Sequence, residues 1–196
     1  MKELYDRAYE TESKKVSVEA AFSSESATLI LNIDGSVPNL EIKREEAEQF
    51  GLLEKNEFHL TVIGYDTGDE ILNAISDLSE KEKEEKINEI SKLSESIEWE
   101  AVLKNDFYYI CKDYNYPDED DPEVEISEKR ESIVQIAEIN GMDEFYQKLN
   151  LLLDKQFKVP LSHITLYTNS DREDRKLTGI GIYSEEQFEE LDPKKI

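Results

Sequence analysis

Both histidines of this chain stand in the same short pattern, in which a histidine is followed by an apolar residue, a threonine and a second apolar residue. The two copies are His59-Leu60-Thr61-Val62 and His163-Ile164-Thr165-Leu166. At ordinary composition a given histidine starts this pattern with a probability of about 0.5%, so two matches are on the order of 1 in 10⁴. Each copy lies in a short apolar run that predicts a β-strand, where alternate residues share one face. Each strand would then present an imidazole beside a hydroxyl; the alternative is two unrelated strand histidines with hydrogen-bonded neighbours.

Two such pairs supply the groups that opening a phosphodiester requires. An in-line displacement at phosphorus needs a base that activates water and an acid that protonates the leaving oxygen. Histidine suits both roles because its ordinary pKa is about 6.5. Threonine hydroxyls can donate to the phosphoryl oxygens and stabilise the charge that develops there. We therefore expect His59, Thr61, His163 and Thr165 to be catalytic, although the sequence does not decide which histidine is the acid.

No metal and no other cofactor is needed for this chemistry. Two histidines without clustered carboxylates make a poor zinc site. The carboxylates of residues 118–121 (Asp118, Glu119, Asp120 and Asp121) are oxygen ligands, but they lack the ordered spacing of a calcium loop. The near-symmetry of the two pairs also permits the reverse reaction, in which a terminal phosphate is joined to a hydroxyl.

Paired motifs of this kind, roughly a hundred residues apart, resemble those of the 2H phosphoesterases. This family includes the bacterial 2′-5′ RNA ligase-like proteins and cyclic nucleotide phosphodiesterases. The resemblance implies a single α+β domain over residues 1–196, with two lobes related by a pseudo-twofold axis. Antiparallel sheets would line a central cleft between the lobes, with the helices outside. The resemblance also implies a metal-independent phosphoesterase that hydrolyses a 2′,3′-cyclic phosphate, a cyclic nucleotide or a short oligonucleotide. The alternatives are a non-catalytic module that binds a nucleotide or an RNA end, and a protein-interaction domain that uses an acidic surface.

The charge of the chain restricts its partners. With 47 acidic and 23 basic residues the net charge is −24, which repels long nucleic acids. A small phosphorylated nucleotide or a short oligonucleotide remains compatible, because a local pocket can be positive on a negative protein. No apolar run is long enough to span a membrane, and the first residues lack the apolar core of a signal peptide. We expect a monomer that does not bind a membrane.

One cysteine, Cys111, allows no internal disulfide, which is typical of a reducing cytoplasm. Its apolar and aromatic neighbours predict a small buried side chain. We therefore expect a cytoplasmic protein in which this thiol is not a nucleophile.

The remaining elements are predicted from periodicity and from turn and cap residues. A strand-helix-strand unit occurs twice, which would bring the two histidines to opposite walls of one cleft. Turn residues at 105–106 predict a short hairpin, two capping boxes predict helix starts at Thr67 and Ser79, and residues 113–125 predict an exposed loop. The predicted strands are 16–22, 28–34, 58–65, 97–103, 107–111, 132–139, 162–168 and 176–183, and the predicted helices are 44–50, one after each capping box, 142–155 and a short one capped by Ser184.

Side chains near the second motif are further candidates for substrate binding. Tyr167 follows Thr165 by two residues and should share its face, as a wall for a base or a ribose. The alternative is a tyrosine at a strand end with its hydroxyl in water. Three basic residues follow the second motif: Arg172, Arg175 and Lys176. Two interpretations are open: these side chains contact a phosphate, or they pair locally with the acidic residues between them.

Overall fold

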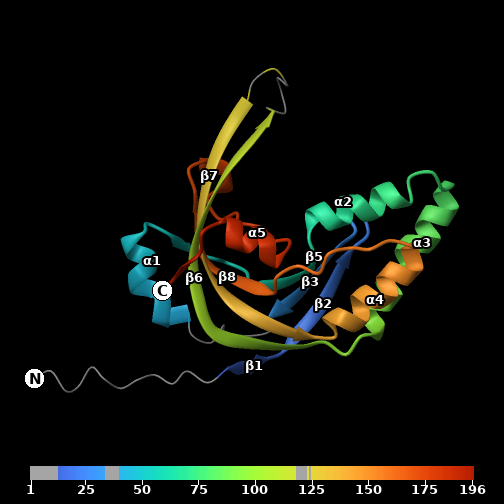
Figure 1. Cartoon of the computed structure of the whole chain (residues 1–196), viewed down its shortest axis with the longest axis horizontal. Helices are drawn as coiled ribbons and strands as arrows, with labels where there is room; N and C mark the ends of the chain where they lie inside the picture. The colour runs from blue at the N-terminus through green and yellow to red at the C-terminus, as the bar shows by residue number, and fades with distance from the viewer. Residues whose placement is uncertain (1–12, 34–39, 118–122, 124) are drawn as a thin grey trace, which may run out of the picture.

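The computed structural model describes residues 13–33, 40–117, 123 and 125–196, which form an α+β fold with two antiparallel sheets (Figure 1). The larger sheet has the strand order β1-β6-β7-β8-β4, with β9 paired to β6, and the smaller sheet has the order β2-β3-β5. The strands are β1 (Lys14–Val16), β2 (Val18–Ser23), β3 (Thr28–Ile33), β4 (Leu53–Glu54), β5 (His59–Ile63), β6 (Glu100–Pro117), β7 (Glu125–Asn140), β8 (His163–Ser170) and β9 (Lys194–Lys195). The helices are η1 (Leu40–Lys43), α1 (Arg44–Gln49), α2 (Tyr65–Ala74), α3 (Glu80–Ser96), α4 (Met142–Leu153), η2 (Glu173–Arg175) and α5 (Glu185–Glu190), with η marking the 3-10 helices.

The chain passes from the larger sheet to the smaller one just ahead of the first motif strand. β4 pairs with β8, where Leu53 lies opposite Thr168. The amide of Lys55 extends this pairing by donating to the Leu166 carbonyl at 3.0 Å. The chain then continues into β5, which joins β3 in the smaller sheet. As a result β5 and β8 lie side by side although they belong to different sheets.

The pairing register of the two motif strands shifts at the same place. Between β3 and β5 the shift lies at Leu29–Ile30 and leaves Val62 as the extra residue. Between β7 and β8 it lies at Ile133–Val134 and leaves Leu166 as the extra residue. Both extra residues directly follow the motif threonine. A β-bulge of this kind changes the side on which later side chains point, so the histidine and threonine of each strand stay together, but counting by two no longer holds beyond the threonine.

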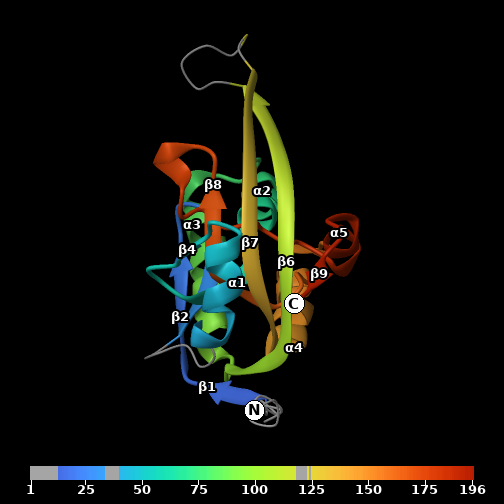
Figure 2. The ribbon, with the colours of Figure 1, turned by 90° about the vertical axis from the view of Figure 1, so that its left-hand side faces the viewer.

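The predicted hairpin across residues 105–106 is wrong. β6 runs through these residues and pairs with β7 on both sides of them, with Leu103 opposite Ala137 and Phe107 opposite Gln135. The turn-prone pair therefore sits in a bulge, which accommodates extra residues within a strand. β6 and β7 form one long, curved hairpin (Figure 2).

The predicted loop at 113–125 is also too long. Residues 113–117 continue β6, and β7 begins at Glu125, ahead of the predicted start at Ser132. The outer parts of β6 and β7 are too polar to be recognised as strands from the sequence. They form strands because they pair with each other. The four carboxylates considered as metal ligands, residues 118–121, lie outside the described residues.

An apolar core joins both sheets to α3 and α4, which lie side by side (Figure 1). The smaller sheet contributes Leu31 and Leu60, and the larger sheet contributes Leu103 and Ile164. Each of these residues is at most 1% exposed. α4 adds Phe145, which is fully buried. The buried side chains of the two motif strands therefore pack into the same apolar core, which fixes the separation of the strands.

Most predicted helices are confirmed, with small shifts at their ends. The capping box at Ser79–Glu82 is present: the Ser79 side chain accepts from the Glu82 amide, and the Glu82 carboxylate accepts from the Ser79 amide. The box predicted at Thr67 is wrong, because α2 already begins at Tyr65 with Gly64 as its N-cap. The amide of Gly68 donates to the Gly64 carbonyl at 2.9 Å, which places Thr67 inside the first turn.

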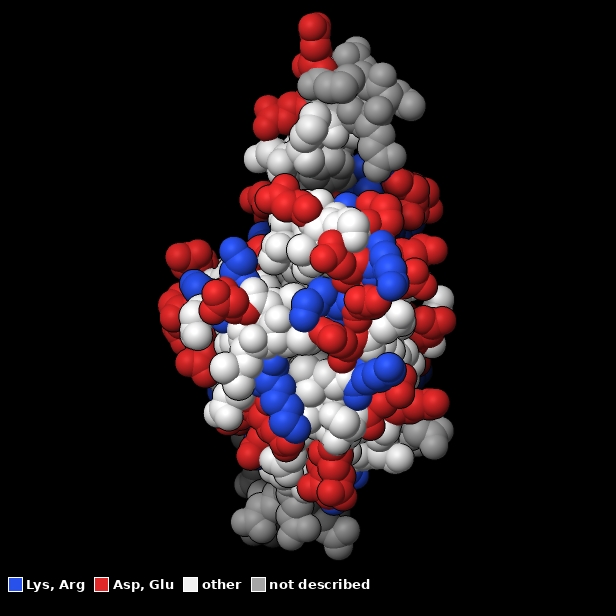
Figure 3. All heavy atoms as spheres, turned by 90° about the vertical axis from the view of Figure 1, so that its right-hand side faces the viewer, with Lys and Arg blue, Asp and Glu red and all other residues white. Residues whose placement is uncertain are grey.

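The surface is strongly acidic, as the composition requires. Acidic side chains are spread over the whole of the face drawn in Figure 3, with basic ones scattered among them. Cys111 is partly exposed on β6, so its predicted burial is wrong. Within the described residues, no helix is both long enough and apolar enough to cross a membrane.

Candidate functional site

Both His-Thr pairs line one cavity of about 710 Å³. His59 and Thr61 reach it from β5, and His163 and Thr165 reach it from β8. The intervening Leu60 and Ile164 are fully buried on the other side, in the apolar core. The structure therefore brings the four candidate catalytic residues to one place, from strands of two different sheets.

His163 is the more enclosed of the two imidazoles, with 8% of the residue exposed. Its Nδ1 lies 2.8 Å from the Leu161 carbonyl oxygen. Because a carbonyl can only accept, Nδ1 carries the proton and Nε2 keeps its lone pair in the neutral ring. Burial lowers the pKa of His163, against the Leu161 and Ile180 carbonyls that favour the charged ring, and the nearby His59 lowers it further. The neutral ring is thus fixed in a tautomer whose Nε2 can accept a proton.

His59 has a charged neighbour. Burial lowers the pKa of His59, and the Lys55 ammonium lowers it further, while the Glu57 carboxylate raises it. The ammonium of Lys55 donates to the Leu177 carbonyl at 2.6 Å, which holds it at the cavity wall. With both pKa values lowered, both imidazoles are uncharged at neutral pH, and the pair accepts its first proton only under more acidic conditions.

Tyr167 does not share the face of Thr165, so that prediction is wrong. The extra residue Leu166 lies between them and reverses the side on which Tyr167 points. Tyr167 is 3% exposed, and its hydroxyl donates to the Leu40 carbonyl at 3.0 Å. It supports the core and is neither a wall of the cavity nor open to water.

The strand predicted at 176–183 is wrong as well, although its alternation is real. Ile180 and Ile182 are each 2% exposed and pack in a small second core, Gly179 and Gly181 are partly exposed, and all four residues contribute to the cavity lining. The segment has no strand pairing. A Cβ added at Gly179 would lie 3.1 Å from the Thr165 hydroxyl oxygen, so the backbone here approaches the threonine closely.

Local pairing, one of the two interpretations of the basic residues after the second motif, holds for two of the three. Arg172 pairs with Asp174, and Lys176 pairs with Glu173, both at 2.6 Å, so local pairing is confirmed for these two. Arg175 instead lines the cavity.

Arg130 is a cavity residue that the sequence analysis missed. Its Nε and one terminal nitrogen donate to the two carboxylate oxygens of Glu128 at 2.6 and 2.9 Å. Ser170 and Tyr116 donate hydroxyl hydrogen bonds to the same carboxylate at 2.6 and 2.8 Å. The Glu128 side chain is 0% exposed, and the hydrogen bonds from Arg130 lower its pKa to about 2. The carboxylate therefore stays ionised at any ordinary pH.

The third guanidinium nitrogen of Arg130 is also hydrogen-bonded, at the cavity wall. This nitrogen donates to the Gly179 carbonyl oxygen at 3.3 Å, and the guanidinium lies 4.3 Å from the centre of the Tyr114 ring. A signal for this residue existed in the sequence, since Glu128 and Arg130 are two residues apart and share a face in a strand. It was missed because the strand was predicted to begin only at Ser132.

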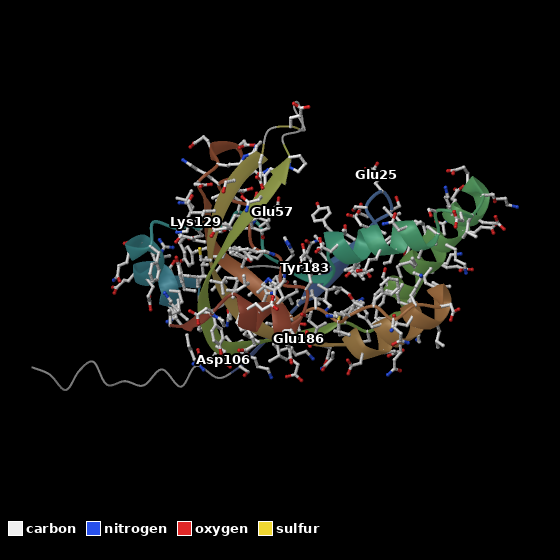
Figure 4. The ribbon with its side chains drawn as sticks, turned by 45° about the horizontal axis from the view of Figure 1, so that its top comes forward. Glu25, Glu57, Asp106, Lys129, Tyr183 and Glu186 are labelled. Carbon is white, nitrogen blue, oxygen red and sulfur yellow. The ribbon has the colours of Figure 1, made fainter. Side chains whose placement is uncertain are left out.

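More basic than acidic side chains line the cavity. Among the described lining residues, three are basic and one is acidic: Lys55, Arg130, Arg175 and Glu57. Aromatic side chains also line it, namely Phe22, Tyr65, Tyr114 and Tyr183. Figure 4 shows Tyr183 between the β6–β7 hairpin and α2. The cavity thus combines cations, aromatic rings and two imidazoles, a set suited to an anionic ligand with an aromatic part.

The part of the chain that the structure describes holds no group of three or more His, Cys, Asp or Glu side chains placed to bind a metal ion. No family model matches the chain, and no curated protein and no solved structure matches it either. The arrangement of side chains in the cavity is therefore the basis for a functional assignment.

Proposed function

We propose that this protein is a metal-independent phosphoesterase of the 2H type that hydrolyses a small cyclic phosphodiester. The observation that carries the proposal is the meeting of two His-Thr pairs, from strands of two different sheets, in one cavity. The common register shift after each threonine supports a duplicated unit, with the two sheets as the two lobes. In this arrangement each lobe supplies one imidazole and one hydroxyl to a single phosphorus.

The proposed reaction places the phosphorus between the two imidazoles. One neutral imidazole removes a proton from water as the water oxygen bonds to phosphorus. The opposite imidazole, in its charged form, donates a proton to the leaving oxygen as the other P–O bond breaks. The products are a phosphate monoester and a free hydroxyl, and one proton transfer between the imidazoles through solvent restores the starting state. Either histidine can take either role, according to the orientation of the substrate.

Hydroxyl and ammonium donors would stabilise the charge on phosphorus. Thr61 and Thr165 lie beside their histidines and can donate to the two non-bridging oxygens. Lys55 adds a positive charge on the same wall, close enough to His59 to lower its pKa. Donors held in position by the sheets need no reorganisation during the reaction, which is why such groups are effective.

The proposed substrate is a small phosphorylated nucleotide or a short oligonucleotide, and the proposed working state is a cytoplasmic monomer. The basic lining attracts a phosphate locally, and the aromatic side chains offer surfaces on which a base can stack. The net charge of −24 disfavours long nucleic acids.

A substrate panel tests the proposal. The wild type and His163→Gln are assayed with 2′,3′-cyclic and 3′,5′-cyclic nucleotides, cyclic dinucleotides and 2′-5′-linked dinucleotides, and thermal unfolding checks that both proteins are folded. The proposal expects turnover of at least one compound by the wild type and a loss of roughly 10²–10⁴-fold in the variant. Tight binding of a nucleotide by the wild type without any turnover would refute the enzymatic proposal and favour a binding module.

A further inference from the structure

The Tyr183 ring lies beside the first His-Thr pair. A Cβ added at Gly64, the residue after β5, would lie 3.0 Å from the nearest ring carbon of Tyr183 and 3.5 Å from the Thr61 methyl carbon. The ring and the methyl group are therefore at most 6.5 Å apart, the sum of the two distances. Both residues line the cavity. The group attached to a phosphate that Thr61 would hold can thus reach this ring.

The Tyr183 ring is also held in place before any ligand arrives. The ring packs against Gly64, and a Cβ added at Gly181 would lie 2.7 Å from the Tyr183 hydroxyl oxygen, so the ring fills space that two glycines leave open. The Tyr183 amide donates to the Gln187 side-chain oxygen at 2.7 Å, which anchors the backbone. Burial and the Asp66 carboxylate raise the pKa of Tyr183 to about 12, so the ring stays uncharged. A surface fixed in this way loses little freedom when a ligand stacks on it, which strengthens binding.

Tyr114, a second tyrosine of the cavity, is already occupied by the protein itself. The Arg130 guanidinium lies 4.3 Å and the Lys112 ammonium 4.8 Å from the centre of the Tyr114 ring. From the centre of the Tyr183 ring the same ammonium lies 6.0 Å away, at the outer limit of a cation–π contact, and Lys112 is not among the described residues that line the cavity. The part of the Tyr183 ring that lines the cavity is therefore open to a ligand.

The two other aromatic side chains of the cavity offer weaker surfaces. Phe22 packs partly against the main apolar core. Tyr65 is 71% exposed, so its position is not fixed by packing, and a base stacked on it would remain largely in water. Tyr183 is thus the aromatic surface that is near the reacting groups, fixed and accessible from the cavity.

We infer that the base of the substrate stacks on Tyr183, and that the protein therefore acts on cyclic phosphates of nucleosides in preference to those of sugars or polyols without a base. The inference rests on the proposed function for the identity of the reacting group. Every base has a π-face, so stacking alone accepts all of the common bases. Purines present the larger face and should be preferred to pyrimidines, because the preference follows stacking strength.

The test measures what the base contributes, in turnover and in binding. Turnover of adenosine 2′,3′-cyclic phosphate is compared with that of methyl ribofuranoside 2,3-cyclic phosphate, which has the same ribose and phosphate without a base. Binding of adenosine 3′-monophosphate is compared with that of methyl ribofuranoside 3-phosphate by calorimetry. The wild type should prefer the adenosine compounds by roughly 10-fold or more, the effect of stacking one base on an aromatic side chain.

Substitutions at Tyr183 assign the preference to this ring. Tyr183→Phe keeps the ring and should keep the preference, whereas Tyr183→Leu should bring both ratios close to one. Tyr108→Leu is the matched control: Tyr108 packs against the second core that also holds Ile180 and Ile182, but it is not one of the described lining residues, so the preference should remain. Thermal unfolding checks that each variant is folded. A similar loss in Tyr183→Leu and Tyr108→Leu would mean a general loosening of the segment, and it would overturn the inference.

Tyr65→Leu tests the rival surface. A loss of the base preference in Tyr65→Leu that is at least as large as the loss in Tyr183→Leu would overturn the assignment to Tyr183.

The outcomes separate this inference from the proposed function. Equal turnover of the two cyclic phosphates by the wild type would overturn the inference without any variant and leave the phosphoesterase intact. A base preference in binding that depends on Tyr183, without turnover of any compound, would support the stacking surface and count against the catalytic proposal. No turnover of either cyclic phosphate together with no binding of either monophosphate would overturn both.

Discussion

Replacing Glu128 by glutamine should destabilise the fold by about 3 kcal/mol at pH 7. The pKa of Glu128 falls from its ordinary value of 4.5 to about 2, and one pKa unit corresponds to about 1.4 kcal/mol. The independent figure for breaking a buried ion pair is roughly 3–5 kcal/mol, because the remaining charge stays buried without a partner. Here that charge belongs to Arg130, whose side chain is 10% exposed.

The pH dependence of this effect has a defined sign. A carboxylate whose pKa is lowered in the folded state stabilises the protein above its unfolded pKa, near 4.5, and loses this contribution as the pH falls toward 2. The difference in the free energy of unfolding between wild type and Glu128→Gln should therefore shrink by roughly half or more between pH 7 and pH 3.

Urea unfolding followed by tryptophan fluorescence measures both quantities. The chain has a single tryptophan, Trp99, whose ring packs 5.6 Å from that of Phe145 in the core. Glu138→Gln is the matched control on the same strand, because Glu138 is 58% exposed in its pair with Lys104 and should contribute about 1 kcal/mol or less. If Glu128→Gln cost no more than Glu138→Gln at pH 7, the buried pair would not stabilise Arg130 as described.

Three further predictions concern the reaction. Because both histidine pKa values are lowered, kcat/KM should follow a bell-shaped pH profile with its maximum below about pH 6.5. Lys55→Gln should move this profile toward higher pH, because the variant removes the cation that lowers the pKa of His59. A profile that does not move would count against an interaction between Lys55 and His59. Gly179→Ala should lower kcat without unfolding the protein, because its Cβ would lie 3.1 Å from the Thr165 hydroxyl and displace it; unchanged kinetics would mean that this hydroxyl is not needed where it lies. Turnover should survive dialysis against a chelator, and complete loss that a divalent ion restores would refute the metal-free mechanism.

Much of the site could be predicted from the sequence because its signal is local. A histidine and a threonine two residues apart in an apolar run determine their own shared face, whatever the rest of the fold does. The meeting of the two strands followed from the repeated strand-helix-strand unit. Neither inference depends on contacts between distant residues.

The errors arose where distant pairing overrides local pattern. Tyr167 was placed by counting residues from Thr165, and counting cannot detect the extra residue Leu166. The turn residues at 105–106 are absorbed in a bulge because β6 continues past them and pairs with β7, the next strand, on both sides of the bulge. The alternation at 176–183 buries Ile180 and Ile182 as a strand would, but none of the described strands pairs with this segment.

A double-mutant cycle on the two histidines tests the central claim most directly. His59→Gln, His163→Gln and the double variant are compared with the wild type by kcat/KM on the phosphodiester that is turned over, with circular dichroism to confirm folding. If the imidazoles act as one acid–base pair, each single replacement should cost roughly 10²–10⁴-fold, and the double replacement should cost far less than the product of the two. Near-full activity of folded His163→Gln, or losses that simply multiply, would contradict a catalytic pair.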